Sequence, residues 1–317
     1  MAKKRKPRRK ADDAAPGIDQ DDNHPPEPTT TGEQPKPSEE ATEQEIIEIN
    51  VEHFTIPYND KTIPSEIRGE GEVPALIWTH GAGGGLAAPA ASEFANGFAE
   101  SSAILSFQGS MNLPSRTKMF HAVMEHEKFD TALGGRSMGA RAAVMAATQQ
   151  DRQTKALVLV SFPLVGGKKN DSREQILLNL PESVDVLFIS GDHDSMCNLE
   201  QLMEVIQRMK AKCWLVTVKG ADHGMSWKPN GSVAAMRRKT GAVAAEWLKS
   251  REDGNRYCSL SWDKDGKIGE MRCTDWLASS PAQIEATEDS AQRVANKAEA
   301  TEDDEPPAVK KRRRGKT

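Results

Sequence analysis

The chain has 317 residues, a length that fits either one large α/β domain or two average domains. Its formal net charge of −5 is unevenly spread, because seven of its 42 Lys and Arg residues lie in the first ten residues and six lie in the last eight. The rest carries 29 basic and 47 acidic residues, a balance near −18, so direct nucleic-acid binding is not expected of a globular domain between the two ends.

Both ends of the chain are predicted to be disordered arms. Residues 1–44 and 281–317 are rich in Asp, Glu, Pro and Thr and have few large apolar residues. Segments of this composition cannot bury enough surface to offset the entropy lost on ordering. A short amphipathic helix over residues 282–298 is the alternative within the second arm. The folded part is therefore expected over residues 45–250, with an extension over residues 251–280.

Apolar runs alternate with helical patterns between these arms. Strands are predicted over residues 46–57, 73–80, 102–107, 131–135, 155–162, 184–190 and 212–218. Helices are predicted over residues 91–100, 115–127, 138–149, 172–180, 198–210 and 232–250. Continuous apolar runs with many β-branched residues are typical of parallel strands that are buried on both faces. The alternation predicts an α/β fold with a doubly wound, mostly parallel sheet, whose ligands bind beyond the C-terminal ends of the strands.

The extension over residues 251–280 has the pattern of a β-hairpin. Cys258, Leu260 and Trp262 alternate with polar residues before a DKDG turn, and a second short run ends at Cys273. We expect this hairpin to pack against the core, and its pattern indicates no further role.

Two features exclude whole classes of protein. The chain has no run of about 18 apolar residues, and no apolar segment follows its basic start, so neither a membrane span nor a secretory leader is expected. Its cysteines show no CxxC spacing, which argues against a zinc ribbon and a secreted disulfide framework. They are Cys197, Cys213, Cys258 and Cys273. We therefore expect reduced thiols in an intracellular protein.

The segment GGRSMGARAA, Gly134 to Ala143, joins a predicted strand to a predicted helix. Within it, Ser137 lies between Gly135 and Gly139 in a G-x-S-x-G, a pattern that permits the sharp turn on which a nucleophilic serine is exposed. Its hydroxyl would lie at a helix N-terminus, where peptide N–H groups favour developing negative charge. The alternative is an ordinary serine in a Gly-rich turn, because this motif also arises by chance.

The segment THGAGGG, Thr79 to Gly85, directly follows another predicted strand. Its Gly-rich turn can aim the N–H of Ala82 at the same point as the N–H of Met138, which would form an oxyanion hole with two donors. We expect His80 to order this loop by hydrogen bonding. A phosphate-binding loop is the alternative, but neither GKS nor GxGxxG follows.

Two further polar motifs lie just past the ends of strands. FISGDHD supplies Asp194, and GADHG supplies His223. With Ser137 they stand in a chain order known for Ser-His-Asp triads, and the topology of a parallel sheet would bring them together. His223 would accept the serine proton, and Asp194 would orient the imidazole.

Other residues compete for these roles. Asp192 is the alternative to Asp194 as the acid, whereas Asp222 is expected to brace its own loop and His193 to be exposed. A metal site is a weaker alternative, because its spacing matches no zinc signature, and neither a metal nor a cofactor is expected. It would use Asp192, His193, Asp194, Cys197 and His223.

The motifs THGAGG, GGRSMGARAA, SFPL (Ser161 to Leu164), GDHD and GADH occur in this order within residues 73–249. Together they resemble the α/β-hydrolase-like domain shared by testis-expressed (Tex-type) proteins and the third regulatory subunit of the NSL histone-acetyltransferase complex, a relative of dienelactone hydrolases. The resemblance implies an α/β-hydrolase fold without a large lid. It also implies Ser137 as nucleophile, His223 as base and Asp194 as acid.

Two functions from different classes follow. The first is a serine hydrolase that acts on an ester, thioester or related acyl bond of an unknown substrate. The second is a non-catalytic interaction module in a nuclear protein complex, because the family is associated with chromatin and fold membership alone does not establish activity.

The basic clusters KKRKPRRK and KKRRR fit nuclear localisation signals, since an import receptor can bind short Lys/Arg runs on exposed arms. Solvated tails or nonspecific nucleic-acid arms are the alternative. The expected location is the nucleus, or the nucleus and the cytoplasm.

Overall fold

The computed structural model describes residues 49–129, 132–149, 154–166, 171–228, 232–263 and 270–279. Both predicted arms, their basic clusters and the alternative helix over residues 282–298 lie outside this part of the chain. Within it, no helix is long and apolar enough to cross a membrane.

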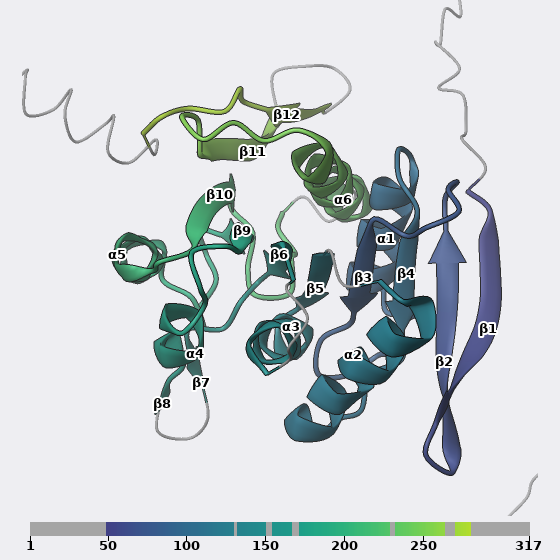
Figure 1. The fold of residues 1–317 in the computed structure, drawn as a ribbon. Helices are drawn as coiled ribbons and strands as arrows, with labels where there is room; N and C mark the ends of the chain where they lie inside the picture. The colour runs from purple at the N-terminus through teal and green to yellow at the C-terminus, as the bar shows by residue number, and fades with distance from the viewer. Residues whose placement is uncertain are drawn as a thin grey trace, which may run out of the picture. The chain divides into compact units, whose positions relative to one another are not determined.

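Strands and helices alternate along the described chain much as the sequence predicts (Figure 1). The strands are β1 (Val51–Tyr58), β2 (Lys61–Arg68), β3 (Leu76–Thr79), β4 (Ile104–Phe107), β5 (Ala132–Arg136), β6 (Ala156–Val160), β7 (Val165–Gly166), β8 (Asp171–Ser172), β9 (Asp185–Gly191), β10 (Lys212–Val218), β11 (Tyr257–Asp263) and β12 (Glu270–Cys273). The helices are α1 (Pro89–Ala99), α2 (Leu113–Glu127), α3 (Met138–Thr148), α4 (Glu174–Leu178), α5 (Leu199–Arg208) and α6 (Val233–Lys249).

One ten-stranded sheet organises the described chain, in the order β1-β2-β4-β3-β5-β6-β9-β10-β11-β12. The run from β4 to β11 is parallel throughout, and antiparallel strands flank it on both sides. The chain passes from β3 to β4 on one side and then returns to β5 on the other side of β3. The loops that follow β3 and β5 therefore meet at a topological switch point, where ligands bind in sheets of this kind.

Helices cover the sheet on both faces, and each face has its own apolar core (Figure 1). Helices α2, α3 and α5 contribute to one core, and α1 and α6 contribute to the other. Strand β6 shows why its sequence is continuously apolar: Leu157 and Leu159 point into the first core, while Val158 and Val160 point into the second. This arrangement is the doubly wound α/β sheet that the sequence predicts.

The structure differs from the sequence prediction mainly outside the central strands. Strand β2 was not predicted, because its sequence KTIPSEIR carries charges and Pro64 and lacks a long apolar run. It nevertheless forms, since β1 pairs with it on one side and β4 on the other, both antiparallel. The helix predicted over residues 172–180 is shorter, because Ser172 belongs to β8 and the helix begins at Glu174.

The predicted hairpin continues the main sheet. Strand β11 pairs parallel with β10, and β12 pairs antiparallel with β11. Cys258 and Leu260 are fully buried on β11, so this segment completes the core beneath α6. The four cysteines are free thiols, three of them buried and Cys273 exposed.

Helices α1 and α6 cross at two glycines, which allow their backbones to touch. A methyl group at Gly97 would overlap the carbonyl of Arg238, and one at Gly241 would overlap the carbonyl of Phe94. Both potential obstacles are backbone atoms, so neither can be moved without separating the helices.

The substitution Gly241→Ala is therefore expected to lower the free energy of unfolding by about 1–3 kcal/mol, the usual cost of overpacking. Helix propensity alone would raise it by up to about 1 kcal/mol. Urea unfolding of the wild type and of Gly241→Ala measures whether the free energy of unfolding falls or rises. Ala234→Gly, at an exposed position of the same helix, is the control and should lose about 0.5–1 kcal/mol. A Gly241→Ala protein as stable as the wild type would show that the helices do not cross this closely.

Candidate active site

The turn at Ser137 is sharply strained. Ser137 lies between the end of β5 and the start of α3, with a φ of 52° and a ψ of −110°. Such a conformation costs a non-glycine residue of the order of 1–3 kcal/mol. A methyl group at Gly135 would overlap the backbone of Gly139, and one at Gly139 would lie 2.5 Å from the carbonyl oxygen of Thr79. Neither flanking position can therefore carry a side chain.

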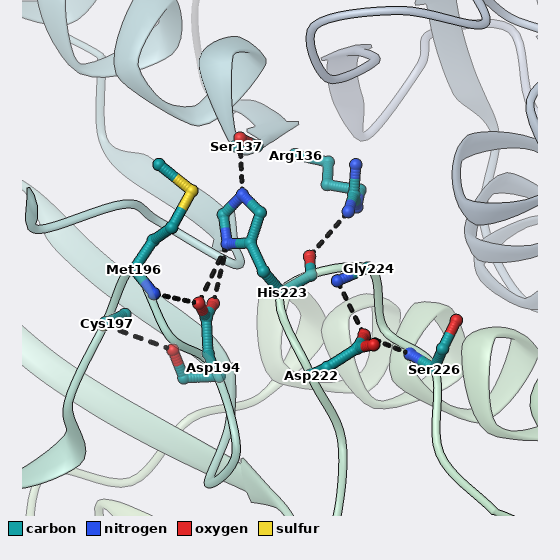
Figure 2. Close-up of polar contacts among 10 residues, drawn as sticks. Arg136, Ser137, Asp194, Met196, Cys197, Asp222, His223, Gly224 and Ser226 are labelled. Atoms are coloured by element: carbon teal, nitrogen blue, oxygen red, sulfur yellow. Dashed lines mark hydrogen bonds and ion pairs between the residues drawn. The ribbon is translucent and has the colours of Figure 1, made fainter. Parts of the chain in front are cut away.

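Three side chains form a hydrogen-bonded row at this turn (Figure 2). Ser137 Oγ lies 2.9 Å from His223 Nε2, and His223 Nδ1 lies 2.9 Å from Asp194 Oδ2 and 3.0 Å from Oδ1. Since the carboxylate accepts a hydrogen bond from Nδ1–H, Nε2 is left unprotonated and can accept the serine proton. The Asp194 side chain is fully buried, the His223 side chain is 21% exposed, and Ser137 is buried, so the row is largely shielded from solvent. The structure thus brings together the three residues predicted from the sequence.

The loops that carry Asp194 and His223 are joined because β9 and β10 are neighbours. His193 N–H donates to the carbonyl of Ala221, and the N–H of Gly220 donates to Asp192 Oδ1 at 2.6 Å. Asp192, the alternative acid, therefore braces the neighbouring loop. The N–H of Met196 donates to Asp194 Oδ1 at 2.8 Å, which fixes the carboxylate that faces His223 (Figure 2).

Three more side chains hold the histidine loop. Asp222 Oδ1 accepts from the N–H groups of Gly224 and Ser226, as expected of a residue that braces its loop. Arg136 Nη2 donates to the carbonyl of His223 at 2.6 Å (Figure 2). Arg237 of α6 donates to the carbonyl of Gly224 at 3.1 Å.

The two residues predicted to form an oxyanion hole, Ala82 and Met138, line the same cavity as Ser137 and His223. Met138 is the first residue of α3, where a peptide N–H has no acceptor within the helix. Within the described residues, the N–H of Ala82 donates no hydrogen bond. Both donors are thus available beside the serine.

His80 orders the Gly-rich loop, as the sequence predicts. Its Nδ1 donates to the carbonyl of Gly81 at 2.7 Å, and its Nε2 accepts from the N–H of Gly109 at 3.0 Å. This pattern requires the neutral imidazole, because a protonated Nε2 could not accept. Burial and the nearby Arg116 guanidinium lower the pKa of His80 from 6.5 to about 4.

Arg116 is a residue that sequence reasoning missed. Its fully buried guanidinium donates to carbonyls in the loops that follow β3 and β4. These carbonyls belong to His80, Gly81, Gly109 and Ser110. Burial lowers the pKa of Arg116 to about 10. No local pattern indicates this role, because the four acceptors are backbone atoms.

The cavity beside Ser137 has a volume of about 340 Å³. Its lining residues are Ala82, Arg136, Ser137, Met138, Arg141, Pro163, Arg173, Met196 and His223. Among the described residues, no group of three or more His, Cys, Asp or Glu side chains could hold a metal ion. His193, a member of the alternative metal set, is exposed. The cavity offers a hydroxyl, an imidazole and three guanidinium groups instead.

Residues 72–249, more than half of the chain, match the family of alpha/beta hydrolase domains. The chain belongs to this alpha/beta hydrolase family. Est1E from Butyrivibrio proteoclasticus has a similar structure, with a TM-score of 0.50 at 16% identity over 62% of this chain and 99% of that chain. Dienelactone hydrolase from Anabaena variabilis has a TM-score of 0.51 at 14% identity over 63% and 97% of the two chains. At these identities the two likenesses show the fold alone, and they confirm the predicted alpha/beta hydrolase fold.

The pKa of His80 makes the stability of this alpha/beta hydrolase depend on pH. His80 takes up a proton near pH 6.5 in the unfolded chain and near pH 4 in the folded protein. The contribution of the neutral His80 side chain to the free energy of unfolding is therefore complete above pH 6.5. Between the two values the unfolded state binds more protons, and the free energy of unfolding falls by up to about 1.4 kcal/mol per pH unit as the pH drops.

Urea unfolding at pH 7.5 and pH 5 measures this effect. The wild type is expected to lose about 2 kcal/mol more than His80→Asn over this interval. The exposed His193 provides the matched control, since His193→Asn should keep the pH dependence of the wild type. Equal pH dependence in the wild type and His80→Asn would contradict the neutral, hydrogen-bonded state of His80.

Proposed function

We propose that this protein is a serine hydrolase that cleaves an ester, thioester or related acyl bond. The observation that carries the proposal is the row from Ser137 through His223 to Asp194, in which each side chain lies within hydrogen-bond distance of the next. A nucleophile, a base and a buried acid in this order are the arrangement that activates a serine.

The proposed reaction has two halves. As Ser137 Oγ attacks the acyl carbonyl, His223 Nε2 takes its proton, and Asp194 stabilises the imidazolium that forms. The N–H groups of Ala82 and Met138 stabilise the tetrahedral oxyanion. His223 then protonates the departing alcohol or thiol, which leaves an acyl-serine. In the second half His223 removes a proton from water and the hydroxide attacks the acyl-serine. The bond to Ser137 Oγ then breaks, His223 returns its proton to that oxygen, and the acid is released.

Labelling of the purified full-length protein with a fluorophosphonate probe tests the nucleophile directly. The wild type is expected to be labelled, whereas Ser137→Ala and His223→Ala are not. Hydrolysis of a short-chain p-nitrophenyl ester should fall by about a thousandfold or more in both variants.

The exposed Ser195, in the neighbouring loop, provides a matched control. Ser195→Ala should be labelled and active like the wild type, and circular dichroism establishes that each variant is folded. Equal hydrolysis by the wild type and Ser137→Ala would refute the proposed nucleophile.

We further propose that the domain is close to those of the testis-expressed proteins and the NSL-complex subunit. The five motifs in common order support this placement. In that case a nuclear interaction module is the second candidate function, and the two basic clusters support it. A well-folded wild type that is not labelled by the probe would favour this candidate. Recovery of a stable nuclear complex that is unaffected by Ser137→Ala would favour it further.

The nuclear location has its own test. Deletion of both basic clusters from a fluorescently tagged chain is expected to shift the protein from the nucleus to the cytoplasm, because an import receptor would lose its binding sites. Microscopy of the double deletion and of each single deletion measures the shift. A doubly deleted protein that stays nuclear would contradict direct import through these clusters.

A further inference from the structure

The cavity beside Ser137 is positively charged. Arg136, Arg141 and Arg173 line it, and none of the described residues that line it is Asp or Glu. The positive charge is local, because the chain between its two basic ends is strongly acidic. The three arginines differ in the groups that surround their charges.

Arg136 has a structural role. Its Nη2 donates to the carbonyl of His223 at 2.6 Å, which holds the histidine loop in place. Burial and the neighbouring Arg237 lower the pKa of Arg136, while Asp194 and Asp222 oppose this shift. The carboxylates of Asp194 and Asp222 therefore partly balance the charge of Arg136.

Arg141 and Arg173 have no such partners. Within the described part of the chain, neither side chain makes a hydrogen bond or an ion pair. The Nε of Arg141 is buried without a hydrogen-bond partner. Burial, followed by the charge of Arg173, lowers the pKa of Arg141, so the two guanidinium groups are close enough to repel each other.

Both arginines lie beside the serine, in the lining of its cavity. Arg141 lies on the first turn of α3, and its peptide N–H donates to the carbonyl of Ser137 at 3.1 Å. The guanidinium of Arg173 lies directly against Gly166, where it occupies the place that a side chain would take. Two half-buried like charges without a counter-ion are destabilising, and an anion between them would relieve that cost.

We propose that the substrate of this hydrolase carries a carboxylate or phosphate group on its acyl part, and that this group binds between Arg141 and Arg173. The proposal rests on the serine hydrolase function and narrows it to acidic acyl substrates. Planar guanidinium groups match the two oxygens of such anions. The cavity volume of about 340 Å³ is near the lower limit for small-molecule sites, which favours a short acyl chain.

A binding experiment tests the anion site without catalysis. Full-length Ser137→Ala protein is titrated calorimetrically with linear dicarboxylates from succinate to suberate, and separately with inorganic phosphate. Binding of one of these anions is expected, and adding Arg141→Gln or Arg173→Gln should weaken it about tenfold or more. Arg238→Gln removes one charge at an exposed site on α6 and is the matched control.

The outcomes of the titration are distinct. Binding of dicarboxylates identifies a carboxylate site, and binding of phosphate alone identifies a phosphate site. Binding of neither anion overturns the proposal, as does binding that both arginine variants leave intact. Two independent arginine variants are used so that one poorly folded protein does not decide the result.

A turnover experiment separates this proposal from the hydrolase function on which it rests. Values of kcat/KM are compared for p-nitrophenyl half-esters of the same dicarboxylic acids and for neutral esters of equal length, after subtraction of spontaneous hydrolysis. The wild type should favour the charged ester about tenfold or more, and this ratio should fall in both arginine variants but not in Arg238→Gln.

Ser137-dependent hydrolysis with no preference for the charged ester overturns the anionic acyl group and leaves the hydrolase function standing. Anion binding at Arg141 and Arg173 without Ser137-dependent hydrolysis of any ester supports the anion site and overturns the hydrolase function.

Discussion

The geometry of the site depends on one close backbone contact, in which the first turn of α3 meets the end of β3. A side chain at Gly139 would collide with the carbonyls of Thr79 and His80. The contact places Ser137, at the entry to α3, beside the Gly-rich loop at the exit of β3. The positive φ of Ser137 is the local cost of this approach, and packing of the buried α3 residues Ala140, Ala142 and Ala143 against the core offsets it.

A buried cation that has no carboxylate partner among the described residues reinforces that contact. Arg116 reaches from α2 to the carbonyl oxygens of the loops after β3 and β4. Peptide dipoles, whose oxygens point at the guanidinium, take the place of a counter-ion. His80 can accept the N–H of Gly109 beside this charge only as the neutral ring, so electrostatics and hydrogen bonding select the same state. The loop that faces Ser137 is thus held by hydrogen bonds from Arg116 and His80.

Sequence reasoning succeeded where a local pattern coincides with a structural requirement. Strand β10 was predicted to the residue, since a strand buried on both faces is a nearly continuous apolar run. The proximity of Ser137, Asp194 and His223 was predicted because each lies in the loop that follows such a strand. Strand β2 could not be predicted, because it is stabilised by pairing with β1 and β4 and not by its own composition. The charges of Arg141 and Arg173 were also missed, because whether an arginine has a partner depends on tertiary neighbours.

The three residues of the row lie far apart in the sequence, and this separation determines when they come together during folding. Ser137 and His223 are 86 residues apart, and Asp194 lies 29 residues before His223. The strands that carry them are parallel, and parallel neighbours are reached only through crossover connections. No single hairpin or helix can therefore bring the three side chains together. Contacts between residues so far apart in the sequence form slowly. Formation of the contact between Ser137 and His223 after dilution from denaturant would therefore report completion of the central sheet, whereas a helical signal would report local segments.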